Sequence, residues 1–266
     1  MENNDKIISS VELQEELKKL PPQQFFSTGM KYLDKLVEKM AEGDFWVIAA
    51  EQKQGKTQLA VSISTNLIKQ GVNCLWLEAE LSYREFFKRF GAELPVFYLP
   101  NRQLRMPTLT WIELKIKEAK DKFNTKVIFI DDLGMIADEE MYKHKHAIEI
   151  YGIRMQRIKE LCLKYRVCIV GIAHVHKEAA KRKKAGMDTS DIKGAMDLAY
   201  RADTLIGIER LVGTTATKTI QEMDNQEEFL FSRDCYIYVM DCRRTGSRRI
   251  RIKCYIDDDG FIKEYE

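Results

Sequence analysis

The sequence FWVIAAEQKQGKT, residues 45–57, decides the fold of this chain. Its first six residues are all apolar and predict a buried strand, and the residues after it have the apolar spacing of a helix. The loop between them closes on Gly55, Lys56 and Thr57, which matches the phosphate-binding P-loop with Ala50 where glycine is more usual. Backbone N–H groups of such a loop can surround a phosphate, and the helix adds its positive N-terminal end. The alternative is an ordinary strand–turn–helix corner.

A second motif supports a nucleotide site. Residues 127–130 are apolar and lead into Asp131, which predicts a buried parallel strand with a carboxylate at the edge of the sheet where ligands bind. We expect Lys56 to contact the β- and γ-phosphates of ATP, Thr57 to bind Mg²⁺ and Asp131 to support the same ion. An acidic residue that only caps the next turn is the alternative for Asp131. The candidate cofactor-binding residues are Ala50, Gln52, Lys53, Gln54, Gly55, Lys56, Thr57, Gln58 and Asp131.

Length and composition fit one α/β domain with a sizeable core, or two small ones. The chain has 266 residues, of which 45% are hydrophobic and 32% charged, and its net charge of +2 shows no overall bias toward polyanions. The six cysteines include no Cys-x-x-Cys pair, so we interpret them as reduced thiols of a cytoplasmic protein. No apolar run approaches the ~20 residues of a membrane span, and the N-terminus does not resemble a signal peptide, so we expect no membrane partner.

Residues 1–25 are expected to form a separate N-terminal arm, and residues 26–266 the main domain. In the arm, Ser10 is the candidate N-cap of a helix over 11–20, which the two prolines at 21–22 bring to an end. A helix this short is marginal alone. It is therefore either a frayed tail or an arm that packs on a neighbouring subunit.

In the main domain, strand patterns alternate with helix patterns. The expected strands are 45–50, 74–78, 96–99, 127–131, 167–173, 204–209, 235–240 and 249–256. The expected helices are 31–40, 57–70, 82–90, 110–123, 145–165 and 193–201. This alternation indicates an α/β fold with a mostly parallel central sheet and helices on both faces. The last two strands lie close enough to form a C-terminal β-hairpin across Arg243–Ser247.

The strand at 74–78 ends in a turn with two acidic side chains, Glu78 and Glu80. Hydrolysis needs a group that activates or orients water beside the γ-phosphate, and either glutamate can supply it. A solvated glutamate at a helix start is the alternative.

The strand at 167–173 ends in two histidines, His174 and His176, which lie on one face of an extended segment. We expect His174 to donate to the γ-phosphate, with a satisfied histidine at a strand end as the alternative. Zinc would need further ligands, and the other histidines of the chain are His144 and His146.

Two basic segments are candidates for binding polyanions. Lys181, Arg182 and Lys183 follow the His174 strand and can bind a DNA backbone or form a solvated face. At the hairpin turn, Arg243 or Arg244 can supply a guanidinium to the γ-phosphate bound by a neighbouring subunit. The alternative is a cationic hairpin tip on the surface.

From Phe26 onward, over about nine-tenths of the chain, the order of these motifs resembles the RecA-like core of the DnaB-type (superfamily 4) replicative helicases. Residues 27–36 are similar to the "TGfxxLDxl" segment of that family. Glu80-Leu81-Ser82, with Arg89 nine residues on, resembles its "EMS…R" segment, which implies that Glu80 is the catalytic glutamate. Asp131 matches the Walker B aspartate.

The resemblance also covers the DNA-binding and inter-subunit elements. Residues 191–203 are similar to the loop that lines the family's central channel, which places Lys193 at the DNA-contacting basic position with Gly194 beside it. Residues 243–246 resemble the motif "KxRxG", which implies that Arg244 is the arginine finger for the neighbour's ATP.

The chain departs from the family pattern at several positions. His174 stands where the family usually has glutamine, a substitution similar to the plasmid-type RepA hexameric helicases, which also lack a large N-terminal domain. Cys242 replaces the lysine of "KxRxG", so either Arg243 or Arg244 remains a candidate for the finger. Met196 stands in the channel loop where glycine is common.

The resemblance implies an ATP hydrolase that forms a homo-oligomeric ring, a hexamer, moves along single-stranded DNA and unwinds duplex during replication. A separate loader, initiator or primase is a candidate partner, and the small size fits a phage, plasmid or other mobile element. The alternative is a RecA-like ATPase that does not unwind, such as a recombination or annealing accessory or a regulatory hexamer. A scaffold that binds nucleotide without hydrolysis is a further alternative, against which Lys56, Thr57, Glu80 and Asp131 argue.

Overall fold

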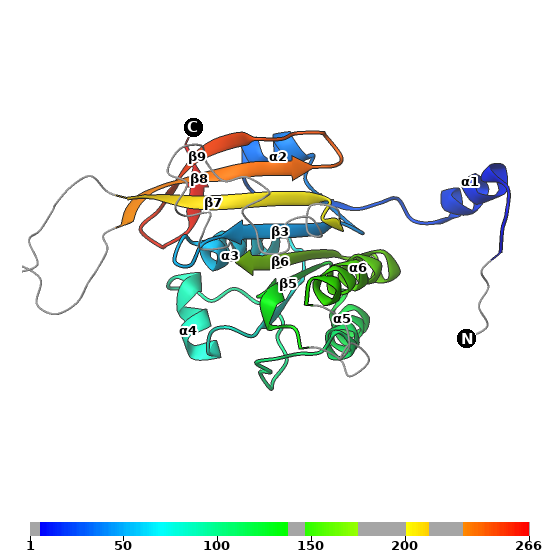
Figure 1. Ribbon diagram of the computed structural model, residues 1–266, viewed down its shortest axis with the longest axis horizontal. Coiled ribbons are helices and arrows are strands. Elements are labelled where there is room, and N and C mark those ends of the chain that lie inside the picture. Colours follow the sequence, from blue (N-terminus) through cyan, green and yellow to red (C-terminus); the bar gives the residue numbers. More distant parts are fainter. Residues whose placement is uncertain (1–5, 138–146, 175–200, 213–230, 266) are drawn as a thin grey trace, which may run out of the picture.

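The computed structural model describes residues 6–137, 147–174, 201–212 and 231–265. Their centre is an eight-stranded sheet in the order β10-β9-β8-β7-β3-β6-β5-β4 (Figure 1). Neighbours from β7 to β4 pair in parallel, whereas β8, β9 and β10 extend the sheet in antiparallel pairs. The strands are β3 Phe45–Ala50, β4 Cys74–Glu78, β5 Val127–Asp131, β6 Cys168–His174, β7 Thr204–Val212, β8 Phe231–Cys242, β9 Ile250–Ile256 and β10 Ile262–Glu264. The expected α/β fold and its C-terminal hairpin, β8–β9, are confirmed.

Helices cover both faces of this sheet, as the alternation of the buried residues along β3 requires. Trp46, Ile48 and Ala50 belong to the core on the side of α3, whereas Phe45 and Val47 belong to the core on the side of α5 and α6. The helices are α1 Ser10–Lys19, α2 Lys31–Val37, α3 Lys56–Lys69, α4 Tyr83–Phe87, α5 Leu109–Phe123 and α6 Ala147–Tyr165, with 3₁₀ turns η1 Lys88–Phe90 and η2 Leu133–Met135. None of the helices in the described ranges has the length and apolar composition of a membrane span.

An aromatic cluster anchors the sheet edge at β4 and β5. The ring of Trp76 stacks on Phe129 with centroids 4.5 Å apart, and Phe86 packs against the same indole at 4.8 Å. The indole N–H donates to Ser64 Oγ on α3 at 2.9 Å, so the one polar atom of this buried side chain is satisfied. The cluster therefore ties α3 and α4 to the edge of the sheet.

Several sequence predictions need correction. Residues 96–99 form no named strand, because Pro95 and Pro100 flank the segment and lack the N–H that a ladder requires; Tyr98 makes one parallel bridge to Leu75. The helix predicted over 31–40 ends at Val37, since the next residues adopt left-handed backbone and the chain then enters the short strand β2, Met40–Ala41, which pairs with β1, Phe25–Phe26. The pattern predicted no strand at β10. Most of the helix predicted over 193–201 lies outside the described residues.

The N-terminal arm is helical, as predicted, but its cap is Ser9 rather than Ser10. Ser9 accepts from the N–H of Glu12, whose side chain returns to the N–H of Ser9, forming a capping box. No residue of α1 is buried, and Figure 1 shows the helix standing away from the sheet at the end of an extended segment. The arm as a separate domain, and its docking on a neighbour, stay predictions.

Candidate nucleotide site

The P-loop lies between the C-terminal end of β3 and the first turn of α3. Gly55 has a φ of 99°, in the left-handed region that glycine adopts without steric cost, and α3 begins at the next residue. Lys56 is 6% exposed; its ammonium donates to the carbonyl of Glu51 at 2.9 Å and lies 3.2 Å from Nδ1 of His174. Burial lowers the pKa of Lys56, while nearby carboxylates oppose the shift. The loop therefore gathers N–H groups, a helix N-terminus and a buried cation at one place.

Asp131 reaches the P-loop from the end of β5. Its Oδ2 accepts a hydrogen bond from Thr57 Oγ1 at 2.7 Å, and its Oδ1 is buried without a hydrogen-bond partner among the described residues. A hydroxyl and an orphaned carboxylate oxygen are hard ligands that fit Mg²⁺. Burial raises the pKa of Asp131, and burial together with Asp131 raises the pKa of Glu78 on the neighbouring strand β4. A cation beside the two carboxyl groups would offset that cost.

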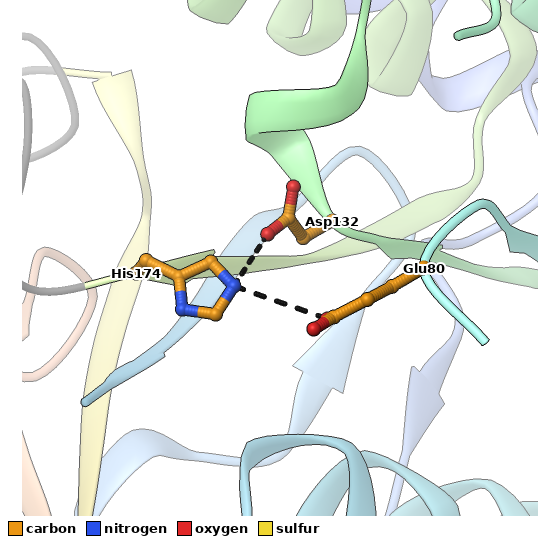
Figure 2. Close-up of side chains that lie close together, drawn as sticks. All are labelled: Glu80, Asp132 and His174. Atoms are coloured by element: carbon orange, nitrogen blue, oxygen red, sulfur yellow. Dashed lines mark ion pairs between the residues drawn. The ribbon is translucent and has the colours of Figure 1, made fainter. Parts of the chain in front are cut away.

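His174 ends β6 and is paired in register with Ala50, the last residue of β3. Figure 2 shows its ring turned toward two carboxylates: Nε2 lies 2.7 Å from Asp132 Oδ2 and 3.8 Å from Glu80 Oε2. The hydrogen bond to Asp132, and then Glu80, raise the pKa of His174 to about 9, while Lys56 opposes them. His174 in turn lowers the pKa of Glu80. The imidazole therefore joins the cation of the P-loop to the acidic turn after β4.

Asp132, Glu80 and His174 also have ligand atoms within 4.8 Å of one another. The contacts of this trio are those of an ion-paired histidine, and each carboxylate already faces the imidazole. An acidic cluster of this kind is by itself common at protein surfaces, so we assign no transition metal to it.

The predicted groups surround one cavity of about 540 Å³. It is lined by Gln52, Lys53, Gly55, Lys56, Thr57, Gln58, Glu80, Leu81, Arg89, His174, Arg210, Ile256 and Gly260. Of the other candidate ligands, Ala50 is buried at the end of β3, and Gln54 accepts the N–H of Arg210 on β7 at 2.7 Å. A larger cavity of about 780 Å³, beside α2 and β10, has none of the predicted site residues among its described lining. The chemistry identifies the smaller cavity as the candidate site.

Arg244 lies at the opposite end of the sheet from this cavity. Its Nη2 donates to both carboxylate oxygens of Asp44, at 2.7 and 2.9 Å, and its Nη1 donates to the carbonyl of Lys39 at 3.1 Å. Asp44 directly precedes β3, whereas the P-loop directly follows it. Arg243 is exposed beside it. The structure thus brings neither arginine to the P-loop of its own chain.

The predicted DNA-binding residues cannot be placed. Lys181, Arg182, Lys183, Lys193 and Gly194 all lie outside the described residues. The sequence analysis gave no role to Asp132, although a second carboxylate directly after the strand-end Asp131 was a usable signal. It also gave none to Gln103 and Arg105, whose contacts with the Glu80 turn no local pattern announces.

Comparison with known proteins supports the expected resemblance. The replicative DNA helicase DnaB of Mycoplasma genitalium is 23% identical over 272 residues, covering 90% of this chain and 56% of the relative. DnaB of Treponema pallidum is 22% identical over 223 residues, covering 73% of this chain and 50% of the relative. The chain thus spans about half the length of these curated relatives. No protein-family model matches the chain.

Solved structures give the fold. One solved ATPase domain superposes with a TM-score of 0.72 at 14% identity, covering 96% of this chain and 97% of that domain. A DnaB-like replicative helicase, described together with its interactions with primase, gives 0.72 at 15% identity and covers 96% of this chain and 67% of its own. The RadB recombinase gives 0.58 at 15% identity, covering 91% of this chain and 100% of its own. The chain has a RecA-like ATPase core of the DnaB type.

Proposed function

We propose that this chain is an ATP hydrolase that drives movement along single-stranded DNA and unwinds duplex during replication. The observation that carries the proposal is the convergence of Lys56, the Thr57–Asp131 pair, Glu80 and His174 around one cavity at the C-terminal ends of neighbouring strands. The likeness to replicative DNA helicases supports the same activity at the level of the family.

In the proposed site, each group has a task that its position permits. Lys56 and the P-loop N–H groups bind the β- and γ-phosphates, and Thr57 and Asp131 hold Mg²⁺, which neutralises charge on the phosphate oxygens. Glu80 orients the attacking water, because its carboxylate is 40% exposed at the mouth of the cavity. His174 binds the γ-phosphate; its Nδ1 faces Lys56 while Nε2 is held by Asp132.

The remaining elements of the proposal come from the resemblance. Lys193 with Gly194, and the run Lys181 to Lys183, contact the DNA backbone, and Arg244 or Arg243 acts on ATP bound to a neighbouring copy. Both assignments need an oligomer, proposed as a hexameric ring. The exposed apolar side chains of α1, with Val11 67% and Leu17 56% exposed, favour the arm as a contact between copies. A separate loader, initiator or primase is the proposed protein partner.

The test is ATP hydrolysis with and without single-stranded DNA, run beside strand displacement on a forked duplex. Glu80→Gln is the control, because it keeps the shape of the side chain and removes the carboxylate. DNA-stimulated hydrolysis with displacement, both lost in the variant, supports the helicase. Stimulated hydrolysis without displacement, also when a loader is supplied, favours the non-unwinding RecA-like ATPase. Nucleotide binding without hydrolysis identifies a scaffold.

A further inference from the structure

The turn that carries Glu80 is held along its whole backbone by side chains. Within residues 78–81, the carboxylate of Glu78 accepts the N–H groups of Glu80 at 2.8 Å and of Leu81 at 2.6 Å. The N–H of Ala79 donates to the carbonyl of Asp131 at 2.7 Å. The backbone donors from 79 to 81 are therefore all engaged, two of them by one side chain.

The carbonyl groups of the same turn are engaged by the loop that precedes α5. Gln103 Nε2 donates to the carbonyl of Glu78 at 3.0 Å and also to that of Leu81. Arg105 Nη1 donates to the carbonyl of Ala79 at 3.1 Å and also to that of Glu80. Two side chains thus take up the four carbonyls from 78 to 81. Such a set leaves the peptide planes on both sides of Glu80 no freedom to turn.

This arrangement has a cost that packing alone does not explain. Glu78 is 3% exposed, and its Oε2 has no hydrogen-bond partner among the described residues. Its neighbour in register on β5 is Asp131, another buried carboxyl group. Burying two acids side by side is unfavourable, and a neutral or apolar residue at 78 would avoid it. The benefit that Glu78 offers instead is its grip on the Glu80 turn.

We propose that Glu78, Gln103 and Arg105 are positioning residues that fix the Glu80 carboxylate at the mouth of the nucleotide site. This inference rests on the proposed function, since Glu80 has its task only in hydrolysis. None of the three needs to touch ATP. They act through the backbone of residues 78–81, so they set the rate of the chemical step and leave nucleotide affinity alone.

The experiment measures the DNA-stimulated kcat for ATP hydrolysis beside the Kd for a fluorescent ATP analogue. Glu78→Ala should lower kcat on the order of 10²-fold, the effect of misplacing a catalytic group by about 1 Å, with Kd within about threefold of wild type. Glu78→Gln should recover most of that rate, because its amide oxygen can accept both N–H groups, whereas Glu80→Gln stays inactive. This difference between two identical substitutions is a readout that general stability does not move.

Two variants in the outer loop protect the test against misfolding of Glu78→Ala. Gln103→Met and Arg105→Met keep side-chain length and remove the donors, and each should lower kcat on the order of tenfold at unchanged Kd. Arg102→Met is the matched control, because Arg102 is exposed in the same loop and makes no hydrogen bond to residues 78–81, all of which are described. It should hydrolyse ATP at the wild-type rate.

The outcomes separate the two proposals. If the wild-type chain hydrolyses ATP and Glu78→Ala or the two loop variants do so at the same rate, the positioning role is refuted while the proposed function stands. If Glu78→Gln is as inactive as Glu80→Gln, the Glu78 carboxylate itself acts on water and the positioning role is again refuted. If the wild-type chain hydrolyses no ATP, the proposed function fails and the inference with it.

Discussion

Substituting Arg244 by alanine should destabilise the folded chain by an amount that depends on pH. The guanidinium donates to both oxygens of Asp44, to the carbonyl of Lys39, and lies 5.4 Å from the ring centroid of Phe25. Removing one partner of a buried ion pair costs about 3–5 kcal/mol. The Arg244 side chain is 25% exposed, and Asp44 keeps hydrogen bonds from the N–H of Ala41 and the indole of Trp46. We therefore expect a loss of about 2 kcal/mol at pH 7.

The pH dependence follows from the carboxyl group left behind. Burial already raises the pKa of Asp44 above its ordinary value, and Arg244 opposes that shift. A carboxyl whose pKa is raised in the folded state destabilises it progressively as pH rises from the unfolded pKa to the folded one. Without Arg244 the folded pKa rises further, so the loss continues to higher pH. The difference between wild type and variant should be small near pH 4 and grow to its full value toward neutral pH.

Urea unfolding at several pH values measures this difference. Arg248→Ala is the matched control: Arg248 pairs with Asp241 at 2.6 Å but is 72% exposed, so its loss should cost less than about 1 kcal/mol. A double-mutant cycle with Asp44→Asn isolates the pair. A loss for Arg244→Ala below about 0.5 kcal/mol at pH 7, or one that does not change with pH, would refute the structural role of this ion pair.

Three further predictions concern other parts of the molecule. Asp132→Asn should lower the pKa of His174 from about 9 toward its ordinary value, because the strongest acceptor of the imidazole loses its charge; NMR titration of the ring measures it, and an unchanged pKa contradicts the contact drawn in Figure 2. Trp76→Leu should cost about 3 kcal/mol of unfolding free energy, since it removes the stack on Phe129 and leaves a cavity; a loss under about 1 kcal/mol would show that the site collapses. Deleting residues 1–19 should leave the unfolding free energy within about 0.5 kcal/mol, because α1 buries no residue, while light scattering should show weaker self-association; a large loss of stability would place the arm in the core of the fold.

The predictions from sequence succeed where one local signal decides the structure. The strands at 45–50, 74–78 and 127–131 have the predicted bounds, because runs of apolar residues are bounded by polar loop residues. The meeting of Thr57 with Asp131 follows from the rule that parallel strands end at one edge of the sheet.

The contacts that the sequence did not reveal join residues far apart along the chain. Gln103 grips a turn more than twenty residues earlier, and Arg244 pairs with an aspartate 200 positions away. No periodicity or cap links such residues, so only the folded topology shows which partner each side chain meets. Local signals also fail at 96–99, where an apolar run between two prolines predicts a strand and tertiary structure allows a single bridge.

The positions of the P-loop and of the arginine turn at opposite ends of β3 constrain the symmetry of any assembly that uses both. A surface patch at one end of the sheet must meet a different patch at the other end of the next copy, so the contact is heterologous. A twofold dimer, in which each patch meets its own image, cannot complete two such sites. Repetition of a heterologous contact either closes on itself or grows without limit as a helical filament. The pitch of a single interface therefore decides between a closed particle of fixed size and an open polymer.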